Sequence, residues 1–154
     1  MRTLAAYLCC GALLAGCYEV NSEPTVPLGI AYIPNFEMQE CAITRVVDGD
    51  TVSVHCGTHE GNVRLVGFDT PETYRPGCPI ERFVGERATR ALKAELRHAK
   101  TITVTSHGRD RYQRALASFK LDGVDLAKIM ISKGLAVPYS GGRRIDWCKR
   151  LANL

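Results

Sequence analysis

Alternating apolar and polar side chains mark the region that follows the first forty residues. The alternation over residues 43–47 and 51–55 predicts two strands, because successive side chains of a strand point to opposite faces. Asp48 and Gly49 lie between these stretches, and Asp-Gly is a strong signal for a tight hairpin turn. Residues 62–68 alternate again and predict a third strand. We therefore expect an antiparallel hairpin followed by a further strand.

A helical period replaces the alternation from Pro79 onward. Apolar side chains recur every three or four residues over several turns, with charged side chains on the opposite face, which predicts a long amphipathic helix. Residues 101–105 and 115–119 return to the strand pattern, and residues 124–133 predict a second helix that ends at Gly134.

The complete pattern indicates the fold class. Trp147 and Leu151 near the end of the chain predict a short third helix, and Ile80 and Phe83 belong to the apolar face of the long helix. Three strands, a helix, two strands and a helix fit a small α+β protein built on a five-stranded OB-type β-barrel with two to three helices.

The first sixteen residues have the anatomy of a secretory signal peptide. Arg2 precedes an uncharged apolar run that is too short to span a bilayer. The run ends in Leu-Ala-Gly-Cys at residues 14–17, which resembles a bacterial lipobox, in which the cysteine becomes the lipidated first residue. An ordinary cleaved signal is the alternative. We expect residues 1–16 to be a lipoprotein-type signal and the chain to be exported, periplasmic or extracellular, and anchored to the cell envelope through lipid on Cys17.

Charge divides the rest of the chain in two. The 154 residues include 20 Lys+Arg and 16 Asp+Glu, a net charge of +4. Residues 17–40 contain glutamates and prolines but no Lys or Arg, which is typical of a tether, whereas residues 41–154 are basic. We expect an acidic Pro-containing tether at 17–40 and one folded domain at 41–154. A basic domain suits an anionic partner such as nucleic acid, although a modest positive charge can serve solubility alone.

Four cysteines remain in the domain once the signal and Cys17 are set aside. An even number in an exported protein favours two disulfide bonds, for which three pairings are possible. Cys41 and Cys56 flank the predicted hairpin turn almost symmetrically, which favours their pairing and leaves Cys78 with Cys148. A four-cysteine zinc site is the alternative, but no Cys-x-x-Cys spacing supports it.

Acidic side chains gather at two predicted turns. Asp50 closes the hairpin turn, and Asp69 and Glu72 follow the third strand around Pro71. Their spacing lets the carboxylates point into one pocket, and carboxylates together with a loop carbonyl are the ligands that Ca²⁺ or Mg²⁺ prefers. Each feature alone is most often an ordinary turn or helix cap.

Arginines accompany these acids. Arg64 lies on the strand that leads to the acidic turn, and Arg114 begins a later strand after a loop that contains Arg109, Arg111 and Tyr112. A guanidinium matches phosphate oxygens in a bidentate way that lysine cannot. Acids for a cation and arginines for a phosphate together indicate phosphodiester chemistry, whereas either group alone is weak evidence.

Three motifs carry a resemblance to a known family. They read Val-Asp-Gly-Asp-Thr-Val at residues 47–52, Arg-Leu-x-Gly-x-Asp-Thr-Pro-Glu-Thr at residues 64–73 and Asp-x-Tyr-x-Arg at residues 110–114. At these residues the sequence resembles the staphylococcal (micrococcal) nuclease family, the thermonucleases, over about residues 42–139. The resemblance implies a Ca²⁺-dependent nuclease that cleaves DNA and RNA by water attack on phosphorus and leaves 3′-phosphate ends.

The resemblance also implies a role for each matching acid. Asp50 and Asp69 would bind Ca²⁺ through their carboxylates, with the carbonyl of Thr70 as a further ligand. Glu72 matches the general base that activates the attacking water. Asp48 matches the neighbouring acid of the turn, which supports the ligands without binding the ion.

The basic residues match as well. Arg64 and Arg114 correspond to the two arginines that grip the scissile phosphate and stabilise its developing charge. Residues that fall where the family contacts the adjacent nucleotide are Arg111, Tyr112 and Tyr139. Nucleic acid is therefore the expected partner, and we expect the protein to be a monomer.

Three departures accompany the resemblance, and one is the set of domain cysteines, which the staphylococcal enzyme lacks. Gln113 stands where the family usually has a glycine before Arg114, and the chain after Tyr139 is short and poorly matched. Residues 141–144 contain two glycines and two arginines, which we interpret as a flexible surface turn. Contact of this segment with a nucleic-acid backbone is the alternative. The intact set of acids and arginines favours an enzyme over two alternatives, a non-cleaving OB-type nucleic-acid-binding module and an accessory envelope protein of exopolysaccharide biosynthesis.

Overall fold

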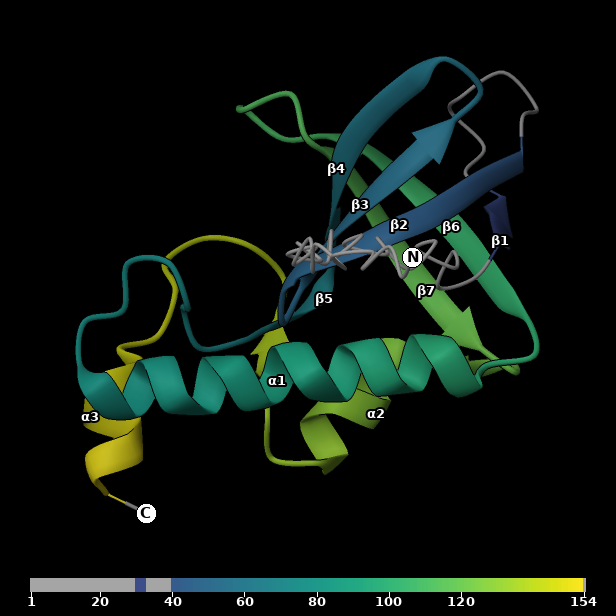
Figure 1. Ribbon diagram of the computed structural model, residues 1–154. Coiled ribbons are helices and arrows are strands. Elements are labelled where there is room, and N and C mark those ends of the chain that lie inside the picture. Colours follow the sequence, from purple (N-terminus) through teal and green to yellow (C-terminus); the bar gives the residue numbers. More distant parts are fainter. Residues whose placement is uncertain (1–29, 33–39, 154) are drawn as a thin grey trace, which may run out of the picture.

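The computed structural model describes residues 30–32 and 40–153 (Figure 1). The predicted signal at residues 1–16, the lipidation site Cys17 and most of the tether at 17–40 lie outside the described residues. Among the residues that are described, no helix combines the length and apolarity needed to cross a membrane.

Five longer strands form one curved sheet. The hairpin of β2 (Glu40–Asp48) and β3 (Thr51–Cys56) continues antiparallel into β4 (His59–Leu65), which pairs in parallel with β7 (Ala115–Leu121), and β6 (Ile102–Arg109) pairs with the far side of β7. The sheet curls so that its two edges approach each other (Figure 1). Together with three helices this confirms the α+β, OB-type fold.

The edge of the sheet carries a short strand that the sequence did not predict. β1 (Ile30–Tyr32) pairs antiparallel with β2, and Ala31 is opposite Cys41. This strand falls inside the segment assigned to the tether. The unpaired backbone of an edge strand offers hydrogen bonds to any extended segment, and the apolar Ile-Ala-Tyr sequence suits that role.

The strand predicted at residues 62–68 is divided in two. β4 ends at Leu65, and β5 (Gly67–Asp69) pairs instead with β9 (Val137–Tyr139) in a separate two-stranded sheet. Gly67 has a φ of +95°, a conformation that glycine adopts without steric cost, so the chain turns there between the two sheets. The turn directs the residues after Phe68 toward the start of the first helix.

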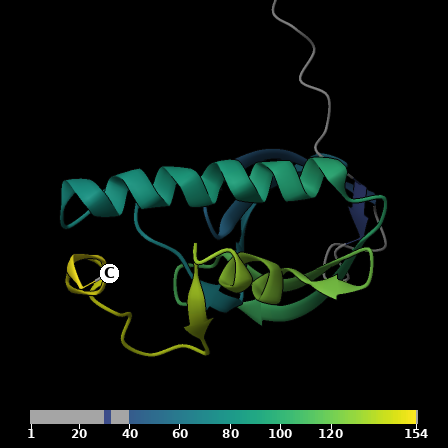
Figure 2. The same cartoon turned by 90° about the horizontal axis from the view of Figure 1, so that it is seen from below.

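The long helix α1 (Pro79–His98) lies across one end of the curved sheet, with α2 beside it (Figures 1 and 2). Proline in the first turn, Glu81 near the N-terminus and basic residues in the last turn suit the helix ends. Its inner face packs on the sheet, but Ile80 and Phe83 are exposed, contrary to the sequence interpretation. The N-terminal end of α1 extends beyond the sheet (Figure 1), so the sheet does not cover these two side chains.

The second and third helices are shorter. Residues 124–133 divide into β8 (Val124–Asp125) and α2 (Leu126–Ser132), because Asp125 accepts a hydrogen bond from the backbone N–H of Ala127 and caps the helix. α3 (Trp147–Ala152) confirms the third helix and is capped by Asp146. The core lies between the sheet and the helices, where each large buried side chain contributes roughly 1.5–3 kcal/mol. Its largest members include Ile43, Val54, Leu65, Phe68, Leu92, Leu96, Phe119, Leu126 and Met130.

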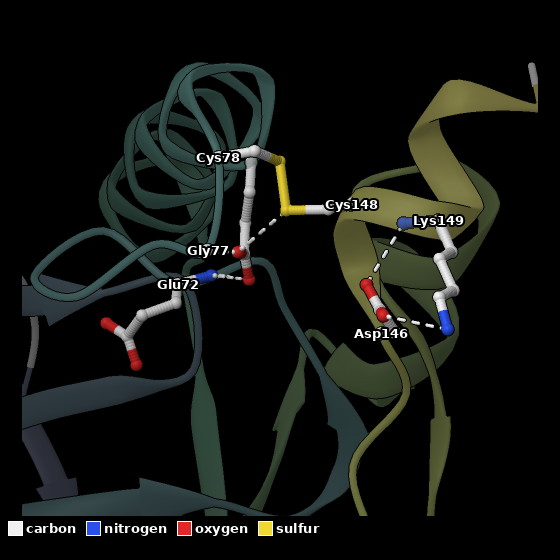
Figure 3. The surroundings of a disulfide bond; sticks show 7 residues. Glu72, Gly77, Cys78, Asp146, Cys148 and Lys149 are labelled. Atoms are coloured by element: carbon white, nitrogen blue, oxygen red, sulfur yellow. Dashed lines mark hydrogen bonds and ion pairs between the residues drawn. A yellow bond between two sulfur atoms is a disulfide. The ribbon is translucent and has the colours of Figure 1, made fainter.

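The described part of the chain contains two disulfide bonds, with the pairing that the sequence favoured. Cys41–Cys56 joins β2 to β3 at directly opposed positions of the hairpin. Cys78–Cys148 joins the residue before α1 to α3 across 70 residues of sequence (Figure 3). The first bond closes a pair of strands that hydrogen bonds already hold, whereas the second fixes the C-terminal helix beside the loop that precedes α1.

Candidate active site

The β2–β3 turn places Asp50 in the interior. The backbone N–H of Asp50 donates to Asp48 Oδ1 at 3.0 Å, which closes the turn. Gly49 lies so close to its neighbours that a Cβ there would meet the side chains of Thr70 and Ala88 at 2.6–2.8 Å. Only glycine lets the turn approach the start of the next loop this closely, and Asp50 is 1% exposed as a result.

Asp50 and Thr70 are joined directly. Both the backbone N–H and the hydroxyl of Thr70 donate to Asp50 Oδ2, each at 3.2 Å. Asp69, at the end of β5, is fully buried beside them. The three predicted cation ligands, separated by about twenty residues of sequence, therefore lie together. We call Asp50, Asp69, Thr70 and the neighbouring Glu72 the acid pocket.

Arg64 bridges the two aspartates. Its Nη1 donates to Asp50 Oδ1 at 2.5 Å and its Nη2 to Asp69 Oδ1 at 3.2 Å. Burial raises the pKa of Asp50 to about 7, even though the charge of Arg64 opposes this shift. The buried carboxylate of Asp50 thus depends on a cationic partner to remain ionised. Arg64 contacts these acids and also lines the cleft described below.

Glu72 is held by the loop that follows. Its Oε1 accepts hydrogen bonds from the backbone N–H groups of Thr73 at 2.9 Å and Tyr74 at 3.0 Å. Partial burial acts to raise the pKa of Glu72, but these N–H groups and the charge of Arg144 outweigh it, so the pKa is lowered. Glu72 is therefore an ionised carboxylate, as a group that accepts a proton must be.

Two residues of α1 position the Glu72 loop. Glu81 accepts a hydrogen bond from the backbone N–H of Glu72 at 3.1 Å and another from Gly77 at 2.6 Å. Gly85 lies against the same loop, where a Cβ would meet the Pro71 carbonyl oxygen at 2.7 Å. Neither residue belonged to a sequence motif, although a glycine inside a helix often marks a close backbone approach.

Arg114 is presented by a self-contained loop, residues 109–114, which we call the basic loop. Asp110 accepts hydrogen bonds from the backbone N–H of Tyr112 at 2.8 Å and from Arg114 Nε at 2.7 Å. Burial acts to raise the pKa of Asp110, but Arg114 outweighs it and the pKa is lowered. Gln113 adopts a φ of +63°, the conformation for which glycine is favoured. The loop thus keeps the glycine-like turn with a bulkier residue.

One cleft joins the two groups of residues. It has a volume of about 1370 Å³, and its lining includes Arg64, Glu72, Arg111, Tyr112, Arg114 and Tyr139. Tyr112 is 65% exposed, with the Arg111 guanidinium 4.8 Å from the centre of its ring, while the Tyr139 hydroxyl donates to the Gly142 carbonyl. Asp50 and Asp69 lie below this lining, in contact with Arg64.

Sequence analysis missed the contribution of the C-terminal segment. Residues 141–144 do not form a simple surface turn, because Arg144 Nε pairs with Asp69 Oδ1 at 2.6 Å and its Nη2 donates to the Thr70 carbonyl oxygen at 2.9 Å. Burial acts to lower the pKa of Arg144, but the nearby carboxylates of Asp69, Asp50 and Glu72 outweigh it and raise it. Buried Trp147 donates to the second oxygen of Asp69 at 2.9 Å. No periodicity or spacing in the sequence indicates either contact.

The donor set fits a hard divalent cation. Two carboxylates and a backbone carbonyl converge within one buried site, and all three already contact guanidinium groups, so the pocket selects positive charge. Oxygen ligands of this kind suit Ca²⁺ or Mg²⁺, and no thiol or imidazole takes part in these contacts. Asp50, Asp69 and the Thr70 carbonyl are the residues that would hold such an ion.

Comparison with known proteins identifies a family and several similar proteins. A family model described as staphylococcal nuclease homologue matches residues 62–149. The chain is 32% identical over 111 residues to the thermonuclease of Staphylococcus hyicus, covering 71% of this chain and 65% of that protein. It is also 34% identical over 105 residues to the SPbeta prophage-derived endonuclease YokF of Bacillus subtilis, covering 65% and 34% respectively.

The matched span contains most of the site. It includes Arg64, Asp69, Glu72 and Arg114, and it extends through the C-terminal segment, whereas the turn with Asp50 precedes it. The chain spans between about a third and about two thirds of the length of these two relatives. Because the family model covers more than half of the chain, the protein belongs to the staphylococcal nuclease homologue family.

Proposed function

We propose that the protein is an exported, Ca²⁺-dependent nuclease that cleaves DNA and RNA and leaves 3′-phosphate ends. The observation that carries the proposal is the convergence of Asp50, Asp69 and the Thr70 carbonyl beside Glu72, at a cleft lined by Arg64 and Arg114. The nuclease names of its relatives support the same activity.

Glu72 is the residue that would activate water. Its carboxylate is ionised and lines the cleft, and its Oε1 is fixed by two backbone N–H groups. It can therefore accept the proton of a water molecule as the water oxygen forms its bond to phosphorus. The bond from phosphorus to the 5′ oxygen then breaks, and that oxygen leaves as a hydroxyl group with a proton taken from solvent water.

The arginines would stabilise the charge that builds on the phosphate. Arg64 lies on β4 and Arg114 immediately precedes β7, and each presents to the cleft a planar set of donors that matches phosphate oxygens. Ca²⁺, when held by Asp50, Asp69 and the Thr70 carbonyl, supplies further positive charge to the phosphate. Exposed Tyr112 offers a ring on which a base can stack without sequence preference.

The remaining parts of the proposal concern location. A lipoprotein-type signal at 1–16, lipid on Cys17 and a tether at 17–40 would place the folded domain, as a monomer, at the outer surface of a membrane. Two disulfide bonds suit an oxidising compartment. Cys17→Ser is expected to release the protein from the membrane fraction, and unchanged fractionation would favour an ordinary cleaved signal.

Glu72→Gln tests the proposed chemistry. The amide cannot accept the proton, so we expect the cleavage rate to fall by about 10²–10⁴-fold while Ca²⁺ and DNA binding remain. Glu86→Gln, on the exposed face of α1, is the matched control and should retain the parent rate. A Glu72→Gln rate within tenfold of the parent would refute the general-base role. A parent protein that binds DNA and never cuts it would favour the binding module.

A further inference from the structure

Arg144 occupies the position in the acid pocket where positive charge is required. Its Nε contacts Asp69 Oδ1 at 2.6 Å, its Nη2 donates to the Thr70 carbonyl oxygen at 2.9 Å, and its Nη1 lies 3.6 Å from Glu72 Oε2. Two of these atoms belong to the proposed cation ligands, and the third belongs to the proposed general base. One guanidinium therefore contacts groups that the proposed reaction needs for the cation and for water.

The C-terminal segment brings Arg144 to this position. Asp146 caps α3, Trp147 is buried and donates to Asp69 Oδ2, and Cys148 is joined to Cys78 at the start of α1 (Figure 3). Arg144 therefore lies three and four residues before two fixed points. We call Arg144, Trp147 and Cys148 the C-terminal clasp.

The two oxygens of Asp69 have different partners. Oδ1 contacts the guanidinium groups of Arg64 and Arg144, whereas Oδ2 accepts the neutral indole N–H of Trp147. A divalent cation and the Arg144 guanidinium repel each other at contact distance, so they compete for Asp69 Oδ1 and the Thr70 carbonyl oxygen. The indole carries no charge and can keep its hydrogen bond while a cation is bound at the other oxygen.

Arg144 is the more easily displaced of the two arginines. The Arg64 side chain is 14% exposed and its backbone is fixed between β3 and β7, whereas the Arg144 side chain is 39% exposed. Gly141 and Gly142, with φ of +103° and +89°, precede Arg144 outside any helix or strand. Arg144 also lines the cleft, so its guanidinium can leave the acids without crossing the core.

We propose that Arg144 is a displaceable internal cation that fills the acid pocket until a divalent cation binds, while Trp147 keeps Asp69 aligned in both states. The proposal rests on the proposed function, because it assumes the same cation site. Arg144 lowers the affinity for the cation by competing with it, and Trp147 raises that affinity by orienting a ligand. Arg144 and Trp147, both in the C-terminal clasp, thus have opposite effects on the affinity for the cation.

Calorimetric titration of the full chain with CaCl₂ tests these two opposite effects on Ca²⁺ affinity. We expect Arg144→Gln to bind Ca²⁺ at least about tenfold more tightly than the parent, because a competing positive charge is gone. Trp147→Phe should bind about 10–100-fold more weakly, because Asp69 loses the donor that orients it. Arg143→Gln, the exposed neighbour, is the matched control and should stay within about twofold of the parent. Thermal unfolding establishes that each variant is folded.

A second measurement follows the unmodified protein and so does not depend on how a variant folds. The Arg144 Nε–H resonance, identified by its loss in Arg144→Gln, should be protected from solvent exchange without Ca²⁺ and lose that protection when Ca²⁺ is added. Equal or weaker Ca²⁺ affinity in folded Arg144→Gln, or unchanged protection at saturating Ca²⁺, would overturn the displacement while leaving the proposed function intact. Absence of Ca²⁺ binding in the parent and in every variant would overturn both.

Discussion

The acid pocket and the basic loop face the same cleft but are built in different ways. The acid pocket joins the turn after β2, the end of β5 and the C-terminal clasp, and its two aspartates are buried. The basic loop is closed by its own backbone and by Asp110, and its Tyr112 is largely exposed. One region depends on contacts far apart in sequence, whereas the other depends on six consecutive residues.

This difference predicts that substitutions in the two regions have different effects. Long-range contacts hold charged groups that are costly to bury, so a change in the acid pocket should affect stability, cation binding and chemistry together. A loop that is closed locally can present an arginine and an aromatic ring to a substrate without altering the interior. Changes in the basic loop should therefore leave cation binding unchanged and alter the stability of the protein by no more than about 1 kcal/mol.

Asp69→Asn is expected to have the largest effect. Loss of this charge removes a proposed cation ligand and deprives Arg64 and Arg144 of an anionic partner. We expect calorimetry to detect no Ca²⁺ binding, the rate to fall on the order of 10³-fold, and chemical denaturation to show a loss of roughly 3 kcal/mol. Asp110→Asn, in the partly exposed pair with Arg114, should cost less than about 1 kcal/mol. Equal losses in the two variants would contradict the comparison.

Arg114→Gln is expected to come next. Removing one preorganised donor to the phosphate should lower the cleavage rate by about 10²–10³-fold. Because Arg114 pairs within its own loop, Ca²⁺ affinity and the denaturation midpoint should not change. A Ca²⁺ affinity that falls together with the rate would show that the two regions are coupled.

Gly85→Ala tests how the acid pocket depends on α1. The new methyl group would lie 2.7 Å from the Pro71 carbonyl oxygen and 2.9 Å from Thr73 Cγ2, so the loop that holds Glu72 must move. We expect a loss of about 1–3 kcal/mol in stability and at least about a tenfold lower rate. Gly61→Ala, where a Cβ meets no atom within 4 Å, is the control and should have little effect.

Gln113→Gly is expected to have the smallest effect. A residue with φ of +63° is strained unless it is glycine, so the substitution should stabilise the protein by up to about 1 kcal/mol. The rate should change by less than about threefold, because the loop already has the conformation that presents Arg114. Destabilisation measured by thermal unfolding would mean that the Gln113 side chain makes a contact that the loop needs.

The sequence predicted the residues of the acid pocket better than the strand division and the C-terminal clasp beside them. An Asp-Gly turn and a strand that ends in Asp-Thr-Pro-Glu are local signals that the sequence displays. The pairing of β3 with β4 and the bend at Gly67 then bring Asp50 and Asp69 together. The division of residues 62–68 at Gly67 was missed, because alternation continues through the bend and only the pairing with β9 reveals it.

The C-terminal clasp could not be predicted from local pattern. Arg144 follows two glycines in an exposed-looking turn, and its contact with Asp69 joins residues 75 positions apart. The path of the chain there depends on the Cys78–Cys148 bond and on burial of Trp147, which no periodicity encodes. Glu81 likewise reads as an ordinary acid of a first helical turn, although it holds the Glu72 loop.

A chelator-controlled cleavage assay on the purified full chain tests the central claim most directly. Single-stranded DNA is incubated with Ca²⁺, with excess chelator, and with Ca²⁺ restored, and binding of the same DNA is measured in parallel. We predict cleavage to products with 3′-phosphate ends, its abolition by chelator and its recovery when Ca²⁺ is returned. Retained DNA binding with no cleavage at saturating Ca²⁺ would contradict the account.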